Sequence, residues 1–426
     1  MTTTTTSKPR RTTKQRDIPV PDPTLTPEGM IERARALREL LRSKQAETEQ
    51  TGRILDEVNK KCIAAGFYRT LQPRRFGGYE FDLPTFVKTM IELSRGCPST
   101  GWVVTFTAGH THVFAKYPEQ TQIEAYGKDG EFRAPLVGGQ AAMARKVDGG
   151  FVISGTWDYA SGIDAATHFF GSAPIRDSME EPSKGLALAL FDRDQIEIEH
   201  NWEMLGMQGT GSNRVIARDV FVPSQRVHER NLLMPVTTPP EERLFDNPMY
   251  TGPSTNILMA EIAAVAVGTG FAALDCFEEV LKRRTAPRST RIRAEDREFQ
   301  VYFGEALATL ETAQAALLGC TQRFMDYCRD EVAGTRPFTP EMSARIVLVE
   351  QQCCRMAGDA VNLMFRMAGT SQAKPGGQMQ RYWRDISTLL THVTLAYDRN
   401  YEAVTKQHFG LDMPPEAASA AASDRA

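Results

Sequence analysis

Residues 155–175 read GTWDYASGIDAATHFFGSAPI, and this stretch is more informative about the fold than any other part of the 426-residue chain. A glycine leads into an aromatic run, the pair Ser161-Gly162 follows, and a second apolar strand comes next. Two strands therefore flank a hydroxyl group that needs a hydrogen-bond partner if it is buried. Further along, residues 206–223 read GMQGTGSNRVIARDVFVP, a glycine-rich turn followed by another strand. Together the two stretches predict a β-rich module in the middle of the chain.

Helical patterns surround this module on both sides. Thr26 followed by Pro27 is a typical helix start, and we expect a helix from there to about Ala65, ended by Gly66. After about Pro253 the chain returns to long Ala- and Leu-rich helical patterns. We expect a mainly α fold with an inserted β-sandwich or barrel. The predicted parts are a disordered tail (1–23), an N-terminal helical domain (24–130), a β-domain (131–230), a C-terminal helical bundle (240–412) and a second disordered tail (413–426).

Composition excludes several classes of protein. The formal net charge of −3 gives no electrostatic basis for binding nucleic acid or an anionic membrane. The chain has no uninterrupted apolar run long enough for a membrane span, and its first residues lack the apolar core of a secretory signal. The 7 cysteines show no CxxC spacing, so we expect neither a disulfide framework nor a zinc site, and a cytoplasmic location. No HxxxH, HExxH or GxGxxG pattern indicates a metal or a bound nicotinamide cofactor.

Five motifs follow one another in the order of a known family: RRFGGYEFDLPTF (74–86), GCPSTGW (96–102), GTWDYASGID (155–164), GMQGTGS with DVFVP (206–223) and GGQMQRYWRD (376–385). On these motifs the chain resembles the acyl-CoA dehydrogenase superfamily over roughly residues 25–412. It is most similar to the two-component (group D) flavin-dependent monooxygenases, such as the oxygenase component of p-hydroxyphenylacetate hydroxylase and the hydroxy-seco-steroid hydroxylase. The resemblance implies a middle β-barrel or sandwich and a C-terminal four-helix bundle.

The resemblance also implies where a flavin binds. Ser161 is expected to offer its hydroxyl and backbone N–H to the N5 and O4 edge of the flavin. Trp157 and Tyr159 are candidates for the walls of the isoalloxazine ring, although either is equally suited to the core. The other flavin-binding candidates are Gly162 beside Ser161, Gly209, Thr210 and Ser212 of the GTGS turn, Arg284 or Arg288 for the phosphate of a neighbouring subunit, and Gly376 and Gly377.

Histidines are the candidates for acid–base chemistry. His110 and His112 stand two residues apart on a predicted helix, so only one can face a given pocket. By resemblance His110 is the histidine that deprotonates or hydrogen-bonds the substrate hydroxyl, while His112 is expected to be structural. His392 lies near the position where dehydrogenases of this superfamily commonly carry a catalytic glutamate, and Met207 is expected beside the substrate. Glu261 remains the alternative base if the chain is a dehydrogenase.

The resemblance therefore implies the oxygenase component of a two-component flavin-dependent monooxygenase. Reduced FMN, or alternatively FAD, would react with O2 to give a C4a-hydroperoxyflavin that hydroxylates a small phenolic substrate. A separate NAD(P)H-dependent flavin reductase would supply the reduced flavin, and a homotetramer would complete the cofactor sites. N-hydroxylation, S-oxidation, FAD-dependent acyl-CoA dehydrogenation and a non-catalytic member of the fold are the alternatives.

Overall fold

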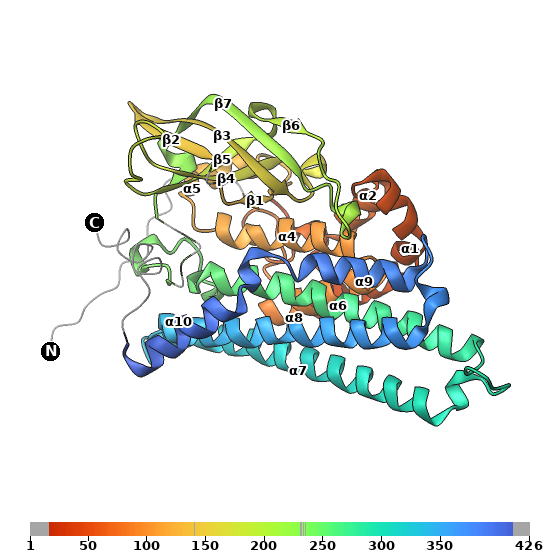
Figure 1. The fold of residues 1–426 in the computed structure, drawn as a ribbon. Coiled ribbons are helices and arrows are strands. Elements are labelled where there is room, and N and C mark those ends of the chain that lie inside the picture. The colour runs from red at the N-terminus through yellow and green to blue at the C-terminus, as the bar shows by residue number, and fades with distance from the viewer. Residues whose placement is uncertain (1–16, 140, 231, 233, 235, 412–426) are drawn as a thin grey trace.

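The computed structural model describes residues 17–139, 141–230, 232, 234 and 236–411. A β-domain lies over a layer of helices from both ends of the chain (Figure 1). The N-terminal helices precede the strands and the long C-terminal helices follow them, so the mainly α fold with an inserted β-domain is confirmed.

The N-terminal domain consists of α1 (Pro27–Thr51), α2 (Asp56–Ala65), α3 (Leu83–Gly96), α4 (Pro98–Phe114) and α5 (Glu119–Tyr126). Thr26 caps α1 by accepting a hydrogen bond from the backbone N–H of Gly29, as its sequence position predicts. Asp82 caps α3 in the same way through the N–H of Thr85. The central helix is α4, which is buried along almost its whole length between the β-domain and α6.

The β-domain is a sandwich of two sheets. One sheet has the strand order β1 (Leu136–Val137), β4 (His168–Pro174), β5 (Leu186–Asp192), β8 (Val227–His228). The other has the order β2 (Ala142–Val147), β3 (Gly150–Ala160), β7 (Asn213–Pro223), β6 (Glu197–Glu199). Alternate residues of β3 and β4, including Phe151 and Phe169, meet in the core between the sheets.

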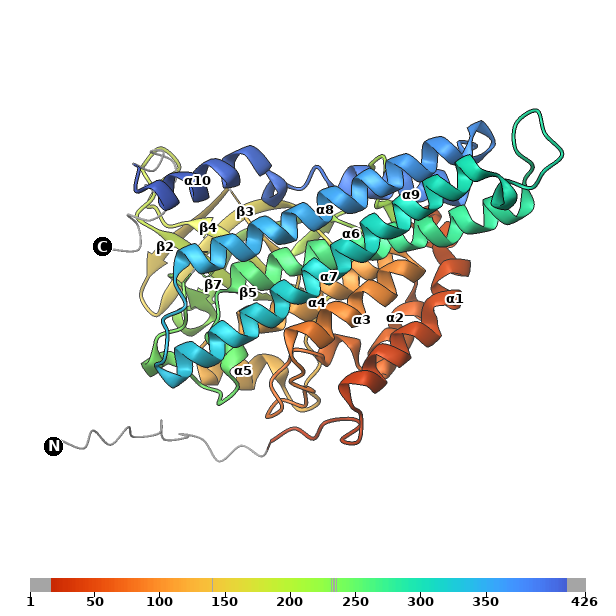
Figure 2. The same cartoon turned by 90° about the horizontal axis from the view of Figure 1, so that it is seen from below.

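The C-terminal domain consists of α6 (Ser254–Arg283), α7 (Arg297–Ala333), α8 (Pro340–Ala368), α9 (Gln378–Leu389) and α10 (Tyr397–Phe409). Figure 2 shows α6, α7 and α8 running side by side, and α9 packs on α6 and α8. Within the described part of the chain, α6 is the helix that is long and apolar enough to cross a membrane. However, 94% of its apolar window is buried inside the protein, which identifies it as the core helix of the bundle.

The structure corrects two predictions about the N-terminus. The helix expected up to Ala65 is broken after Thr51, because Gly52 adopts a left-handed conformation (φ +73°) and ends α1. The tail predicted to be disordered over residues 1–23 is ordered from residue 17, where the backbone N–H of Ile18 donates to Arg75 and the Ile18 side chain is buried. Residues 1–16 and the predicted tail 413–426 lie outside the described residues.

Candidate active site

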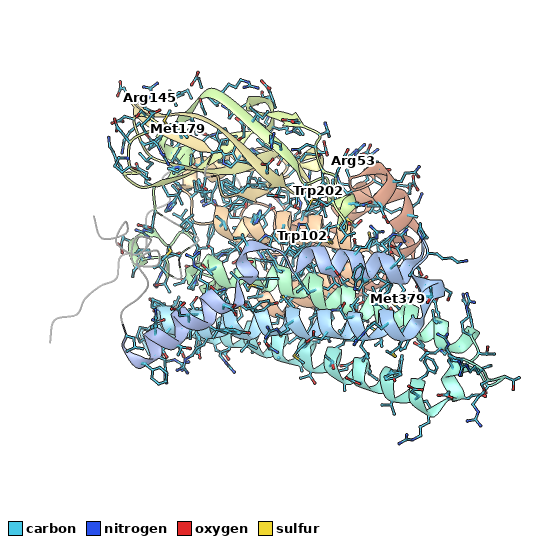
Figure 3. All side chains as sticks on the ribbon, in the orientation of Figure 1. Arg53, Trp102, Arg145, Met179, Trp202 and Met379 are labelled. Atoms are coloured by element: carbon cyan, nitrogen blue, oxygen red, sulfur yellow. The ribbon has the colours of Figure 1, made fainter. Side chains whose placement is uncertain are left out.

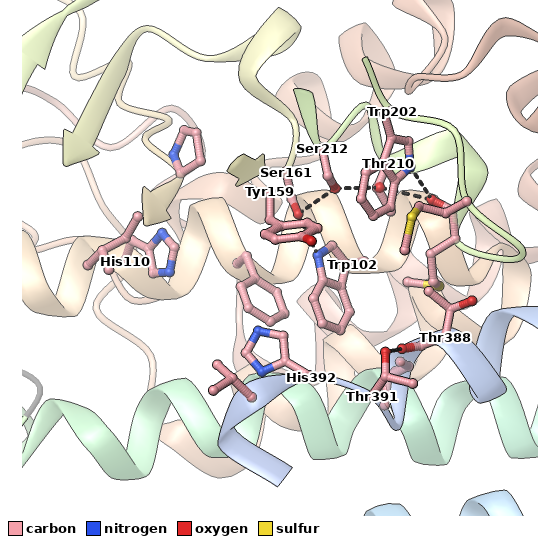
Figure 4. Close-up of a pocket in the computed structure, with 17 residues that line it drawn as sticks. Trp102, His110, Tyr159, Ser161, Trp202, Thr210, Ser212, Thr388, Thr391 and His392 are labelled. Atoms are coloured by element: carbon pink, nitrogen blue, oxygen red, sulfur yellow. Dashed lines mark hydrogen bonds between the residues drawn. The ribbon is translucent and has the colours of Figure 1, made fainter. Parts of the chain in front are cut away.

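A cavity of about 330 Å³ lies between the β-domain, α4 and the end of α9 (Figure 4). Figure 3 shows Trp102 and Trp202 in this region between the β-domain and the helices. The lining is mostly apolar and carries a few hydroxyl and imidazole groups, as is usual for small-molecule sites. The residues that line the cavity come from α4 (Trp102, Phe106, His110), the β-domain and its loops (Pro135, Leu136, Tyr159, Ser161, Trp202, Met204, Met207, Thr210, Ser212) and the end of α9 and the loop after it (Thr388, Leu389, Thr391, His392, Val393).

One face of α4 supplies three rings to the cavity. Trp102, Phe106 and His110 are four residues apart, so successive turns of the helix bring them to the same side. Trp102 stacks on Phe106 at a centroid distance of 4.1 Å, and Phe106 meets His110 edge to face at 6.0 Å. The helix thereby aligns a continuous aromatic wall that ends at an imidazole.

His110 is a buried neutral imidazole with a defined tautomer. Its Nδ1 lies 2.8 Å from the carbonyl oxygen of Ala134, and because a carbonyl only accepts, Nδ1 carries the hydrogen. Nε2 therefore keeps its lone pair. Burial lowers the pKa of His110 to about 4, partly offset by the hydrogen bond to Ala134. At neutral pH His110 is thus in the form that accepts a proton.

His392, in the loop after α9, lines the same cavity and has the other tautomer. The backbone N–H of Thr394 donates to its Nδ1 at 3.3 Å, so the hydrogen of the neutral ring sits on Nε2. The ring meets Trp102 edge to face at 5.8 Å, and burial lowers the pKa of His392 to about 4. The cavity is therefore lined by one imidazole whose Nε2 accepts and one whose Nε2 donates.

His112 and Glu261 lie behind this wall and do not line the cavity. His112 points away from His110, with Nε2 3.0 Å from the carbonyl oxygen of Met249. Glu261 of α6 is fully buried without a hydrogen-bond partner, which raises its pKa well above the usual value. Its carboxylate lies 3.8 Å from Nε2 of His110 and packs against Gly109. This placement supports a structural role for His112 and gives Glu261 no access to a substrate in the cavity.

Hydroxyl groups line the β-domain side of the cavity. Ser161 accepts a hydrogen bond from the indole N–H of Trp102 at 2.9 Å and lies 2.8 Å from the hydroxyl of Ser212. Ser212 in turn lies 2.6 Å from the hydroxyl of Thr210, which donates to the carbonyl of Met207 at 2.9 Å. Figure 4 shows these bonds as a continuous series of dashed lines. The structure thus brings Ser161, Thr210 and Ser212 together, as the sequence motifs indicate.

The end of this hydroxyl series is held by α9. Asp385 accepts a hydrogen bond from the backbone N–H of Met207 at 2.6 Å, and Arg384 donates to the carbonyl of Leu205 at 2.6 Å. Burial raises the pKa of Asp385 to about 6, while the Met207 N–H opposes the rise. The Arg-Asp pair of the fifth motif therefore fixes the loop that carries Met207.

Two residues at the cavity have unusual backbone conformations. Tyr159, at an irregularity between β3 and β7, has φ +71°, and Met207 has φ +54°. Non-glycine residues rarely adopt such angles, and strained backbone is concentrated at functional sites. Tyr159 is 65% exposed and meets Trp202 edge to face at 6.0 Å, so it stands at the mouth of the cavity.

Trp157 is not part of the cavity. Its side chain is 1% exposed, its indole N–H donates to the carbonyl of Ser172 at 2.8 Å, and its ring packs on Phe169 and Phe191. In a regular strand residues 157 and 159 would face the same side. The irregularity in the pairing of β3 with β7 after Trp157 breaks this alternation and turns Tyr159 outward. Of the two candidate ring walls, Trp157 is the core aromatic and Tyr159 faces the cavity.

The remaining candidates lie next to the cavity or away from it. Gly162 (φ +75°) and Gly209 are close-packing positions, where a Cβ would lie 2.6 Å from Val103 and 2.4 Å from Thr48 respectively. Arg284 and Arg288 lie at and beyond the end of α6, in the loop that projects from the bundle (Figure 1, right). Gly376 and Gly377 precede α9. None of these residues lines the described cavity of a single chain.

Trp102, Phe106, Trp202 and Thr391 are cavity residues that the sequence did not assign a role. A signal existed for two of them, because Trp102 and Phe106 share the helical spacing of His110. Trp202 and Thr391 sit on irregular segments, where spacing carries no information. Among the described residues, no group of three or more His, Cys, Asp or Glu side chains is placed to hold a metal ion.

Comparison with known proteins agrees with this architecture. The family models for the acyl-CoA dehydrogenase N-terminal and C-terminal domains match residues 30–129 and 260–397. The flavin-dependent monooxygenase oxygenase subunit HsaA of Rhodococcus jostii (strain RHA1) is 31% identical over 389 residues, covering 89% of this chain and 98% of that protein. The oxygenase component of the FADH(2)-dependent resorcinol hydroxylase of Rhizobium sp. (strain MTP-10005) is 28% identical over 402 residues, covering 90% and 94%.

A solved structure extends the similarity to three dimensions. The crystal structure of 3-HSA hydroxylase from Rhodococcus sp. RHA1 superimposes with a TM-score of 0.82 at 28% identity, covering 90% of this chain and 98% of that one. Both the sequence and the fold therefore match over nearly the whole length of these relatives. The chain belongs to the acyl-CoA dehydrogenase superfamily, in its branch of flavin-dependent monooxygenases.

Proposed function

We propose that the chain is the oxygenase component of a two-component flavin-dependent monooxygenase that hydroxylates a small phenolic substrate. The observation that carries this proposal is the cavity itself, which combines an aromatic wall, a partly exposed serine hydroxyl and two neutral imidazoles of opposite tautomer. The relatives with matching architecture are named as a monooxygenase oxygenase subunit and a resorcinol hydroxylase oxygenase component.

The cavity suits a flavin ring together with a small aromatic molecule. Its volume falls in the range of ligand sites, and its walls are largely aromatic and aliphatic. In this proposal Ser161 holds the N5 edge of the ring, Tyr159 and Trp202 cover its exposed side, and Thr210 and Ser212 support Ser161. Reduced flavin bound there would supply the oxygen-activating chemistry that the family resemblance implies. Reduced FMN is the proposed cofactor, with FADH2 the alternative that the named resorcinol hydroxylase supports.

In this proposal the two histidines have different roles toward the substrate. Nε2 of His110 carries a lone pair and accepts the proton of the phenol, which makes the aromatic ring more electron-rich. Nε2–H of His392 donates a hydrogen bond and positions the substrate oxygen or the oxygen being transferred. Phe106 lies between the two imidazoles, with its ring centroid 6.0 Å from that of His110 and 6.4 Å from that of His392, and together with Trp102 it excludes water from the reacting atoms. Met207 completes the substrate side of the cavity.

Partners follow from the same proposal. The sequence shows no nicotinamide-binding motif, so a separate NAD(P)H-dependent flavin reductase delivers the reduced flavin. We also propose a cytoplasmic homotetramer in which Arg284 or Arg288 of one subunit binds the flavin phosphate held by another, with Gly376 and Gly377 nearby. Light scattering should then give four times the 47.4 kDa of one chain. Replacing the phosphate-binding one of these two arginines by glutamine should weaken flavin binding without changing that mass.

The experiment that tests the proposed function is rapid mixing of oxygenated buffer with the anaerobic protein, reduced flavin and candidate substrates. We expect a long-lived absorbance change distinct from oxidised flavin, followed by a phenol product that carries one atom of labelled O2. Amines and thioethers in the same assay test N-hydroxylation and S-oxidation. Immediate appearance of oxidised flavin and hydrogen peroxide without product from any substrate would overturn the proposal.

A further inference from the structure

The hydrogen-bond series beside the cavity has a direction that its two ends determine. At one end the indole N–H of Trp102 can only donate, so the Ser161 oxygen accepts at 2.9 Å. At the other end the carbonyl of Met207 can only accept, so the Thr210 hydroxyl donates at 2.9 Å. The same carbonyl also accepts from the indole N–H of Trp202 at 3.0 Å, and the N–H of Met207 is bound to Asp385. The two ends of the series are therefore fixed by groups that are not hydroxyls, the indole N–H of Trp102 and the carbonyl of Met207.

The direction of the middle bonds follows because each hydroxyl has one hydrogen. Thr210 uses its hydrogen on Met207, so Ser212 supplies the hydrogen between Ser212 and Thr210, 2.6 Å apart. Ser161 then supplies the hydrogen between Ser161 and Ser212, 2.8 Å apart. The reverse direction would leave two oxygen atoms, of Thr210 and Met207, facing each other without a hydrogen. The series therefore makes one more hydrogen bond in this direction than in the other.

Ser161 consequently faces the cavity as an acceptor. Ser212 and Thr210 are buried, whereas Ser161 is partly exposed to the cavity and is the member that a ligand can reach. Its hydroxyl hydrogen points to Ser212, and its backbone N–H is held by the carbonyl of Tyr159 at 2.9 Å. What Ser161 offers to the cavity is an oxygen lone pair. This differs from the sequence expectation that both the hydroxyl and the N–H of Ser161 donate to a flavin.

We propose that Trp102, Ser212 and Thr210 are positioning residues that fix Ser161 as an acceptor and so select reduced over oxidised flavin. This inference rests on the proposed function, in which Ser161 meets the N5 edge of the ring. Reduced flavin carries a hydrogen on N5 and can donate to Ser161, whereas oxidised flavin presents a lone pair there. Binding oxidised flavin through a donated hydrogen bond would require the whole series to reverse and would lose the Thr210–Met207 bond.

The test compares the dissociation constants of reduced and oxidised flavin, measured by anaerobic and aerobic titration of the full-length protein. In wild type we expect reduced flavin to bind more tightly. Thr210→Val keeps the shape of the side chain but removes the hydroxyl, which frees Ser212 to donate to Ser161 and turns the Ser161 hydrogen toward the cavity. The preference for reduced flavin should fall by roughly two- to tenfold, the value of one hydrogen bond. Thr210→Ser retains the hydroxyl and should keep the wild-type preference.

Ser212→Ala is the second variant, because it removes the middle link without touching the loop that Asp385 anchors. It should reduce the preference to a similar extent. A purely structural effect of either variant would weaken both flavin forms equally and leave the ratio unchanged. An unchanged ratio in Thr210→Val and Ser212→Ala, in a protein that still binds reduced flavin and hydroxylates substrate, would overturn this inference alone. Failure of wild type to bind reduced flavin would instead remove the proposed function and this inference with it.

Discussion

The polar side chains on the two sides of the cavity are oriented by different kinds of hydrogen-bond partner. On the β-domain side, Ser161, Ser212 and Thr210 depend on one another, since each hydroxyl uses the next one as its partner. On the helical side, His110 and His392 are independent: each ring is oriented by a backbone group, the carbonyl of Ala134 in one case and the N–H of Thr394 in the other. A change in the hydroxyl series should therefore spread along it, whereas a change at one histidine should remain local.

The largest expected effect comes from His110. Replacing it by glutamine removes the proton acceptor and should lower the rate of phenol hydroxylation by about 10²–10⁴-fold, the usual contribution of a general base. The dissociation constant of reduced flavin should change little, because the His110 ring is hydrogen-bonded to the carbonyl of Ala134 and not to the hydroxyl series. Product formation and anaerobic flavin titration measure the two quantities. Equal losses of hydroxylation rate and of affinity for reduced flavin would contradict the separation of His110 from the hydroxyl series.

The burial of His110 should also appear in the pH dependence of stability. Its folded-state pKa of about 4 lies below the unfolded value near 6.5, so the unfolded chain binds more protons as the pH falls through this window. The contribution is present above pH 6.5 and is lost toward pH 4. Between pH 7 and 5 it amounts to about 2 kcal/mol.

Chemical denaturation of wild type and His110→Gln at the two pH values measures this contribution. The variant should lose less stability on acidification than wild type does. Asp385, with its raised pKa of about 6, works in the opposite direction in both proteins and cancels in the comparison. An identical pH dependence of the two proteins would contradict the buried, neutral state of His110.

A substitution at Gly109, which packs against Glu261 next to His110, should have a smaller effect, and on stability rather than on activity. A Cβ at Gly109 would lie 1.8 Å from the carboxylate of Glu261, so Gly109→Ala should lower the free energy of unfolding by about 1–3 kcal/mol. Adding Glu261→Ala should recover part of the loss, because it removes the clash. Gly304→Ala is the matched control: it is also within a helix, nothing lies near its added Cβ, and it should stabilise by about 0.5–1 kcal/mol. Thermal and chemical unfolding measure all three.

Trp157→Phe should have the smallest effect on the cavity. The change removes the hydrogen bond to Ser172 and should cost about 1 kcal/mol of stability. Flavin binding should stay within about twofold of wild type, since the ring is in the sandwich core. Tyr159→Phe provides the contrasting position at the mouth of the cavity. A much larger loss of flavin affinity in Trp157→Phe than in Tyr159→Phe would contradict the separation of core and cavity.

Sequence and structure agree where one local pattern determines the outcome. The spacing of His110 and His112 is enough to predict that only one faces a pocket, and Thr26 with Pro27 is enough to place a helix start. Ser161, Thr210 and Ser212 are assigned to the cofactor site by the family resemblance of their motifs, since the local pattern of glycine and hydroxyl residues alone indicates only a turn.

Other features depend on contacts that no local pattern contains. The irregularity of β3 that separates Trp157 from Tyr159 arises from its pairing with β7, and the break after Thr51 arises from a left-handed Gly52 within an otherwise helical pattern. The tautomers of His110 and His392 depend on backbone groups of distant or irregular segments. The direction of the hydroxyl series requires Trp102 and Met207 at its two ends, which are far apart in the sequence.

The most direct test of the central claim is a crystal structure of the protein in complex with anaerobically reduced flavin. The account predicts the isoalloxazine ring in the cavity between the β-domain and α4, with N5 within hydrogen-bond distance of the Ser161 oxygen. His110 and His392 should then face the space left for a substrate beside the ring. A flavin bound elsewhere, or one whose N5 edge meets a group other than Ser161, would contradict it.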